Sequence, residues 1–177
     1  MTEHPPLILT LQLDEQAFAF FNDLRKKHFP PAINYLDAHL TLFHHLPQNP
    51  AITEWLRTVS AKQAPIALEV TNLMKLGRGV AFGIKSEELV WLQANFKKRF
   101  QEWLTPQDRQ GFRPHVTVQN KVTPEKANAL FTELVADFTP FRAEGIGFSL
   151  WEYQSGPWQK VEDFNFFSDA ANTYFES

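Results

Sequence analysis

The chain of 177 residues contains no cysteine, only 7 glycines and no long apolar run. Without cysteine the protein cannot form disulfides, thiolate zinc sites or a cysteine nucleophile. No apolar stretch reaches the roughly 18 residues that a membrane-spanning helix needs. The N-terminus also lacks the basic and apolar parts of a signal peptide. We therefore expect a soluble, cytoplasmic protein that has no membrane partner.

Neither sign of charge dominates, since 17 Lys and Arg stand against 20 Asp and Glu, a formal net charge of −3. A protein that coats long nucleic acid needs many basic side chains to neutralise phosphates, and this composition argues against that class. A small nucleotide, or one end of an RNA, in a locally basic cleft stays compatible with the charge. The length suits a single domain with a sizeable core.

One short pattern is present twice, 76 positions apart. The copies are His39-Leu40-Thr41-Leu42 and His115-Val116-Thr117-Val118. On a β-strand alternate side chains share a face, so each copy directs its imidazole and hydroxyl one way and its aliphatic pair the other. The aliphatic pair then anchors the strand in the core. The pattern predicts two strands, at about 38–46 and 114–121, whose His and Thr side chains face a common groove.

The order of elements also repeats around these strands. Turn residues, caps and hydrophobic periodicity predict strands at about 7–13, 66–76 and 80–85, helices at about 15–28, 51–62 and 87–104, a further helix after Thr123, and two long strands around 154–157. Asp14, Ser86 and Thr123 are the expected helix caps. This order predicts an α+β fold of two pseudo-symmetric lobes, each an antiparallel sheet with helices outside, around a central cleft. We expect one bilobal domain built from an internal duplication of about 6–76 and 80–168.

Two histidines facing one groove can form an acid–base pair that needs no metal or other cofactor. The unperturbed histidine pKa of about 6.5 lets one ring be neutral and its partner protonated near neutral pH. We expect His39 and His115 to be catalytic. Thr41 and Thr117, two residues along on the same faces, can donate to the non-bridging oxygens of a bound phosphate.

Residues of the same parity supply candidate substrate contacts. Phe43 and His45 are expected on the groove face of the first strand, Phe43 as a stacking surface for a base. Arg113 precedes the second signature and is a candidate phosphate contact. His44 is expected on the opposite face, in a structural role. Aromatic residues near the last hairpin either pack or offer another platform: Trp151, Tyr153 and Trp158.

The doubled signature, the Phe112-Arg113-Pro114 lead-in and the repeated βαβ order resemble the two-histidine (2H) phosphoesterase superfamily. Within it, the 2′-5′ RNA ligase and cyclic phosphodiesterase group is the most similar branch. The resemblance implies metal-independent chemistry on 2′,3′-cyclic or 2′-5′ phosphodiesters, with the two histidines catalytic and the two threonines holding phosphate. Many relatives continue the first signature with a Phe-Leu-Gly-like stretch, whereas this chain has Phe43-His44-His45-Leu46-Pro47.

Our leading hypothesis is a monomeric cyclic phosphodiesterase that acts on a small nucleotide or RNA end carrying a cyclic phosphate or 2′-5′ linkage, with no protein partner. Two alternatives share the groove: a module that binds such ends without turnover, and a 2′-5′ RNA ligase that runs the reverse reaction. A metal site built from His39, His44, His45 and His115 is disfavoured, because neighbouring residues of a strand point to opposite faces.

Overall fold

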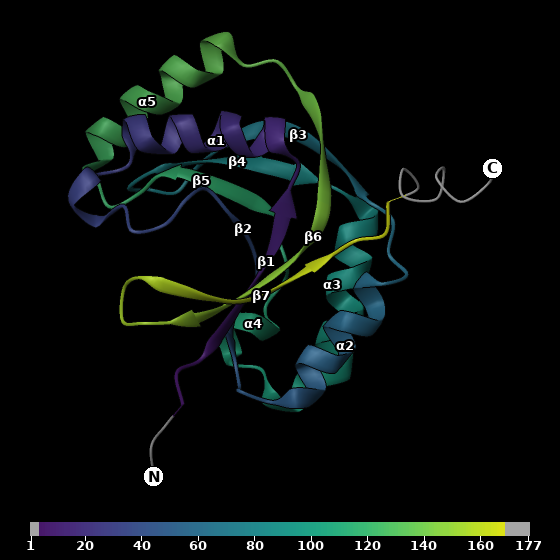
Figure 1. Ribbon diagram of the computed structural model, residues 1–177. Helices are drawn as coiled ribbons and strands as arrows, with labels where there is room; N and C mark the ends of the chain where they lie inside the picture. The colour runs from purple at the N-terminus through teal and green to yellow at the C-terminus, as the bar shows by residue number, and fades with distance from the viewer. Residues whose placement is uncertain (1–3, 169–177) are drawn as a thin grey trace, which may run out of the picture.

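One antiparallel sheet organises the chain (Figure 1). The computed structural model describes residues 4–168. Its strands are β1 (Leu7–Leu13), β2 (Leu40–Leu46), β3 (Ile66–Lys75), β4 (Val80–Lys85), β5 (His115–Gln119), β6 (Phe141–Tyr153) and β7 (Trp158–Asn165). Its α-helices are α1 (Glu15–His28), α2 (Pro50–Ser60), α3 (Glu87–Phe100), α4 (Pro106–Arg109) and α5 (Pro124–Asp137). Short 3-10 helices lie at Pro31–Ile33 and Gln101–Trp103.

The long strand β6 joins the two parts of the sheet. The strand order is β2-β1-β6-β3-β4-β5, with β7 also paired to β6. The N-terminal part of β6 pairs with β3, and its C-terminal part lies between β1 and β7. The α+β class with an antiparallel sheet flanked by helices is confirmed, and the seven strands of residues 4–168 form one continuous sheet. The internal duplication stays a prediction.

The helices begin where local side chains cap them. Asp14, Ser86 and Thr123 accept hydrogen bonds from backbone N–H groups in the first turns of α1, α3 and α5. In Figure 1, α1 and α5 cover the part of the sheet that contains β3, β4 and β5. In the lower right of the view, away from α1 and α5, α2 packs against β6 and β7, and α3 contacts β3.

The two ends of the strand order meet. β2 and β5 lie at opposite ends of that order, yet they contact each other, and α1 packs on β5. The sheet therefore curls until the two signature strands are neighbours, which is the arrangement that a shared site requires.

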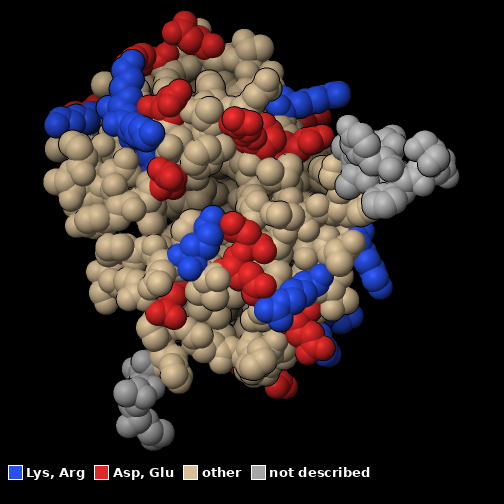
Figure 2. All heavy atoms as spheres, in the orientation of Figure 1, with Lys and Arg blue, Asp and Glu red and all other residues tan. Residues whose placement is uncertain are grey.

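The surface of residues 4–168 mixes both charges. On the face in Figure 2, basic and acidic side chains are interspersed, without a broad basic area. No helix in the described part of the chain combines the length and the apolar character needed to cross a membrane.

Candidate active site

His39 and His115 have the same local arrangement. His39 directly precedes β2 and His115 begins β5. The Nδ1 atom of His39 lies 2.8 Å from the carbonyl oxygen of Asp37, and that of His115 lies 2.8 Å from the carbonyl oxygen of Arg113. A carbonyl can only accept, so Nδ1 carries the proton in both rings. Each ring therefore has Nε2 free for proton transfer.

The surroundings of His39 favour its neutral form. Burial lowers the pKa of His39 to about 4, against the opposing effect of its bond to the Asp37 carbonyl. The charges of Arg25, His115 and His44 lower the pKa further. At neutral pH the His39 ring is a proton acceptor.

Two cavities adjoin the signature strands. One, of about 350 Å³, is lined by His39 and by aromatic and polar side chains that include Tyr35, Trp151, Trp158 and Lys160. The Trp158 ring lies against His39, with centroids 4.7 Å apart.

The second cavity, of about 190 Å³, brings together residues from both signatures. Thr41 of β2 and His115 of β5 line it, with Arg113 and His44 beside them. The fourth signature residue, Thr117, is half-buried in β5.

A family model described as the 2′-5′ RNA ligase superfamily matches residues 13–157. The chain belongs to this superfamily. The resemblance to two-histidine phosphoesterases noted in the sequence is thereby confirmed. A search of curated proteins finds no match.

Several solved structures have the same fold, and their alignments include nearly all residues of this superfamily member. The protein TT0787 of Thermus thermophilus has 17% sequence identity and a TM-score of 0.64, over 91% of this chain and 97% of that one. A phosphoesterase has 16% identity and a TM-score of 0.60, over 94% and 100%. E. coli LigT complexed with 3′-AMP has 17% identity and a TM-score of 0.58, over 94% and 100%.

In this 2′-5′ RNA ligase superfamily member, Arg25 of α1 connects β5 to the segment that leads into β2. Its Nε donates to Asn34 Oδ1 and to the Leu36 carbonyl, both at 2.9 Å, and its Nη1 donates to the Thr117 carbonyl at 3.0 Å. Burial lowers the Arg25 pKa to about 10, so the guanidinium is still charged at neutral pH. The segment that leads into His39 is thereby tied to β5.

Asn22, one turn before Arg25, holds the next residues of the same segment. Its Oδ1 accepts from the Ala38 N–H at 2.9 Å, and its Nδ2 donates to the Asp37 carboxylate at 3.2 Å. The Asp37 carboxylate therefore bonds Asn22, while the Asp37 backbone carbonyl orients His39. Sequence reasoning missed both buried polar residues of α1. The sequence did contain a signal for Arg25. Ala17, Phe21 and Arg25 are spaced four residues apart, which places all three on the buried face of α1.

A β-bulge interrupts β2 directly after Thr41. Thr41 lies opposite Thr10 of β1, but the next pair joins Phe43 to Leu9, which leaves Leu42 as the extra residue. An extra residue exchanges the two faces of a strand until the next irregularity, and a second register shift follows between Phe43 and Leu46. The parity expected from the sequence therefore fails for the residues that lie between these two shifts.

The bulge corrects three expectations. Phe43 is fully buried, with its ring centroid 4.4 Å from that of Phe96, so its expected place on the groove face is wrong. His45 is exposed and does not line the cavity of Thr41 and His115. His44, expected to face away, lines that cavity instead.

Among residues 4–168, no group of three or more His, Cys, Asp or Glu side chains is placed to hold a metal ion.

Proposed function

We propose that this protein is a phosphoric diester hydrolase that opens a 2′,3′-cyclic phosphate, or a related 2′-5′ phosphodiester, on a nucleotide or RNA end. One observation carries the proposal: the Nδ1 atoms of His39 and His115 lie at the same distance from a backbone carbonyl two residues before each histidine. The two signature strands, β2 and β5, lie at opposite ends of the strand order and contact each other. Two pre-oriented imidazoles suit a reaction that removes one proton and supplies another.

The lowered pKa of His39 suggests that it is the base. Neutral His39 accepts a proton from water at Nε2 as the water oxygen bonds to phosphorus. His115 is then the acid, and in its protonated form it gives its Nε2 proton to the departing ribose oxygen as the phosphorus–oxygen bond of the cyclic phosphate breaks. Thr41 and Thr117 donate hydroxyl hydrogen bonds to the non-bridging oxygens, whose charge is spread in the transition state.

The aromatic cavity beside His39 supports a nucleoside as the rest of the substrate. Trp158, Trp151 and Tyr35 line it, and aromatic rings stack on bases of any sequence. Complexes of the structurally similar E. coli LigT with 3′-AMP and with phosphate agree with a small nucleotide ligand.

The test is turnover of a 2′,3′-cyclic nucleotide by the wild type and by His39→Asn and His115→Asn, with chelator present. We expect each variant to lose at least about 10²-fold in kcat, and the double variant little more, because the acid and base act in one step. His45→Asn is the matched control and should stay within about twofold. Full activity in either single variant, or activity that chelator abolishes and metal restores, would overturn the proposal.

The same site could catalyse 2′-5′ ligation, and the superfamily description favours testing this direction. Incubation of a cyclic-ended RNA with an RNA bearing a free 5′-hydroxyl should give a 2′-5′ linkage, by microscopic reversibility. Tight binding in calorimetry with no product in either direction would favour the binding module instead.

A further inference from the structure

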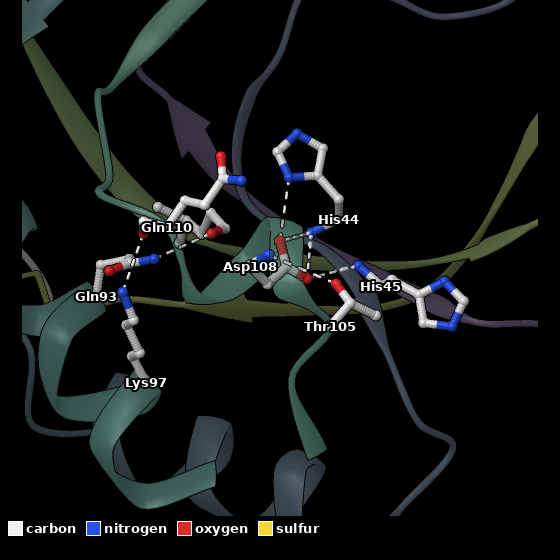
Figure 3. A network of polar contacts seen from close by, with 8 residues as sticks. His44, His45, Gln93, Lys97, Thr105, Asp108 and Gln110 are labelled. Atoms are coloured by element: carbon white, nitrogen blue, oxygen red, sulfur yellow. Dashed lines mark hydrogen bonds and ion pairs between the residues drawn. The ribbon is translucent and has the colours of Figure 1, made fainter. Parts of the chain in front are cut away.

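A buried carboxylate holds the end of β2. Asp108 of α4 accepts from the backbone N–H of His44 at 2.8 Å and from that of His45 at 2.9 Å (Figure 3). Its Oδ1 also lies 3.1 Å from Nδ1 of the His44 ring. Burial opposes ionisation of Asp108, but the bonds from His44 and His45 outweigh it and lower its pKa. Asp108 is therefore an ionised anchor whose oxygens accept hydrogen bonds from the protein rather than from water.

This anchor fixes the direction of the His44 ring. The Asp108 side chain is only 2% exposed, whereas that of His44 is 48% exposed. Because Nδ1 is bonded to the carboxylate, Nε2 lies on the opposite, open edge of the ring. Figure 3 shows the His44 ring over Asp108 and the His45 ring turned away from it. The two adjacent histidines thus differ in orientation although the same carboxylate binds both backbones.

The His44 ring lines the cavity of about 190 Å³ that also contains His115 and Thr41. Arg113 contributes a guanidinium to the same wall, and the amides of Gln93, Gln107 and Gln110 line the remainder. The oxygens of Asp108 already accept from N–H groups, so the guanidinium of Arg113 has no free carboxylate beside it in the cavity lining. The volume lies below the roughly 300–1,000 Å³ of pockets that enclose larger ligands, and suits a small anion.

We propose that His44 and Arg113 form a second anion subsite, which binds a phosphate of the substrate other than the one that reacts. The subsite rests on the proposed function, because it shares its cavity with His115 and Thr41. A His44 ring that carries a proton on each nitrogen donates to the carboxylate at Nδ1 and to an anion at Nε2, and a guanidinium pairs with phosphate oxygens in a fixed geometry. The substrate class is a cyclic-ended nucleotide or RNA end that carries a phosphate on its 5′ oxygen.

The experiment compares three substrates: adenosine 2′,3′-cyclic phosphate, the same compound with a 5′-phosphate, and a dinucleotide with a 2′,3′-cyclic end. A charge-assisted hydrogen bond corresponds to about tenfold or more in binding, so the wild-type KM should be about tenfold lower for the 5′-phosphorylated compound than for the plain one. An equal gain for the dinucleotide identifies an RNA end as the source of the phosphate. A gain confined to the 5′-phosphorylated compound identifies a mononucleotide.

His44→Phe and Arg113→Gln should each reduce this tenfold preference to within about twofold. Arg113 is exposed, and the side chain of Asp108 bonds His44 and His45 rather than Arg113, so the Arg113 variant also covers the case in which His44→Phe fails to fold. His45→Phe is the matched control, since its ring lies outside the cavity, and it should keep the preference. No preference in the wild type, or a preference unchanged in both variants, would overturn the subsite.

A binding measurement separates this inference from the proposed function. Calorimetry with adenosine 3′-phosphate and adenosine 3′,5′-bisphosphate needs no turnover. If no cyclic substrate is opened, but the bisphosphate binds more tightly than the monophosphate and only when His44 is present, the subsite stands and the hydrolase proposal fails. If the cyclic substrates are opened and the second phosphate changes neither KM nor binding, the hydrolase stands and the subsite fails.

Discussion

Replacement of Arg25 by Met tests how the two signature strands are held together. The Arg25 residue is 4% exposed, and two of its N–H groups make the three contacts to Asn34, Leu36 and Thr117. Met has a similar length and apolar volume but no donor, so the variant removes these bonds without opening a large cavity.

The expected loss of stability follows from the bonds removed. A hydrogen bond from a charged donor contributes about 1.5–3 kcal/mol, so two N–H groups contribute about 3–6 kcal/mol. The lower end applies, because burial already disfavours the charge and lowers the Arg25 pKa to about 10. A loss of about 3 kcal/mol in a chain of this size lowers Tm by about 6–12 °C.

Circular dichroism gives the Tm, and turnover of a 2′,3′-cyclic nucleotide at low temperature reports on the site while the variant is still folded. We expect kcat to fall by about tenfold or more, because small displacements of reacting groups are costly. Arg57→Met is the matched control. Arg57 pairs with Glu162 at 3.0 Å, but its side chain is 61% exposed, and such pairs contribute at most about 1 kcal/mol.

Two results would refute this reasoning. A Tm for Arg25→Met within about 2 °C of that for Arg57→Met would show that the guanidinium does not stabilise the junction. A lowered Tm with a wild-type kcat at low temperature would show that Arg25 stabilises the fold without positioning the catalytic groups.

Three further outcomes follow from burial and stacking. Between pH 6.5 and about 4, unfolded His39 binds a proton that the folded protein does not, so the free energy of unfolding should fall by up to about 3 kcal/mol as the pH drops through this window. Urea titrations at the two ends of this window should show a smaller fall for His39→Asn, and an equal fall would contradict the lowered pKa. Phe43→Ala should lower the free energy of unfolding, measured in urea, by about 3–5 kcal/mol, because the Phe43 ring is fully buried. The same variant should change the KM for the nucleotide little. Trp158→Ala should raise that KM by about tenfold with a smaller effect on stability, and the reverse pattern would restore Phe43 as the base platform.

Much of the fold was readable because its signals are local. A cap such as Asp14 or Ser86 bonds a backbone N–H three residues away, so the helix start needs no distant partner. Apolar alternation likewise located β2 and β5, and placed His and Thr of each signature away from the core. These predictions use only neighbours in the chain.

The direction of the side chains in the second half of β2 could not be predicted, because it depends on the register of β2 against β1. Nothing in the order Leu42-Phe43-His44-His45 shows where the register against β1 shifts, yet these shifts decide which histidine enters the cavity. The anchor of His44, Asp108, is 64 residues away in sequence. From the sequence alone, the segment from Thr105 to Gly111 is interpreted as a loop, and nothing in it points to β2.

By itself the sequence determined the elements and the paired His and Thr residues, because alternation and capping act over a few residues. The tertiary structure decided which ends of the sheet meet and to which face the residues after Thr41 point. It also decided that Arg25 bonds Thr117, which lies 92 residues away in the sequence. Strand register and buried polar contacts depend on chain segments far apart in sequence, and these become neighbours only when the sheet closes.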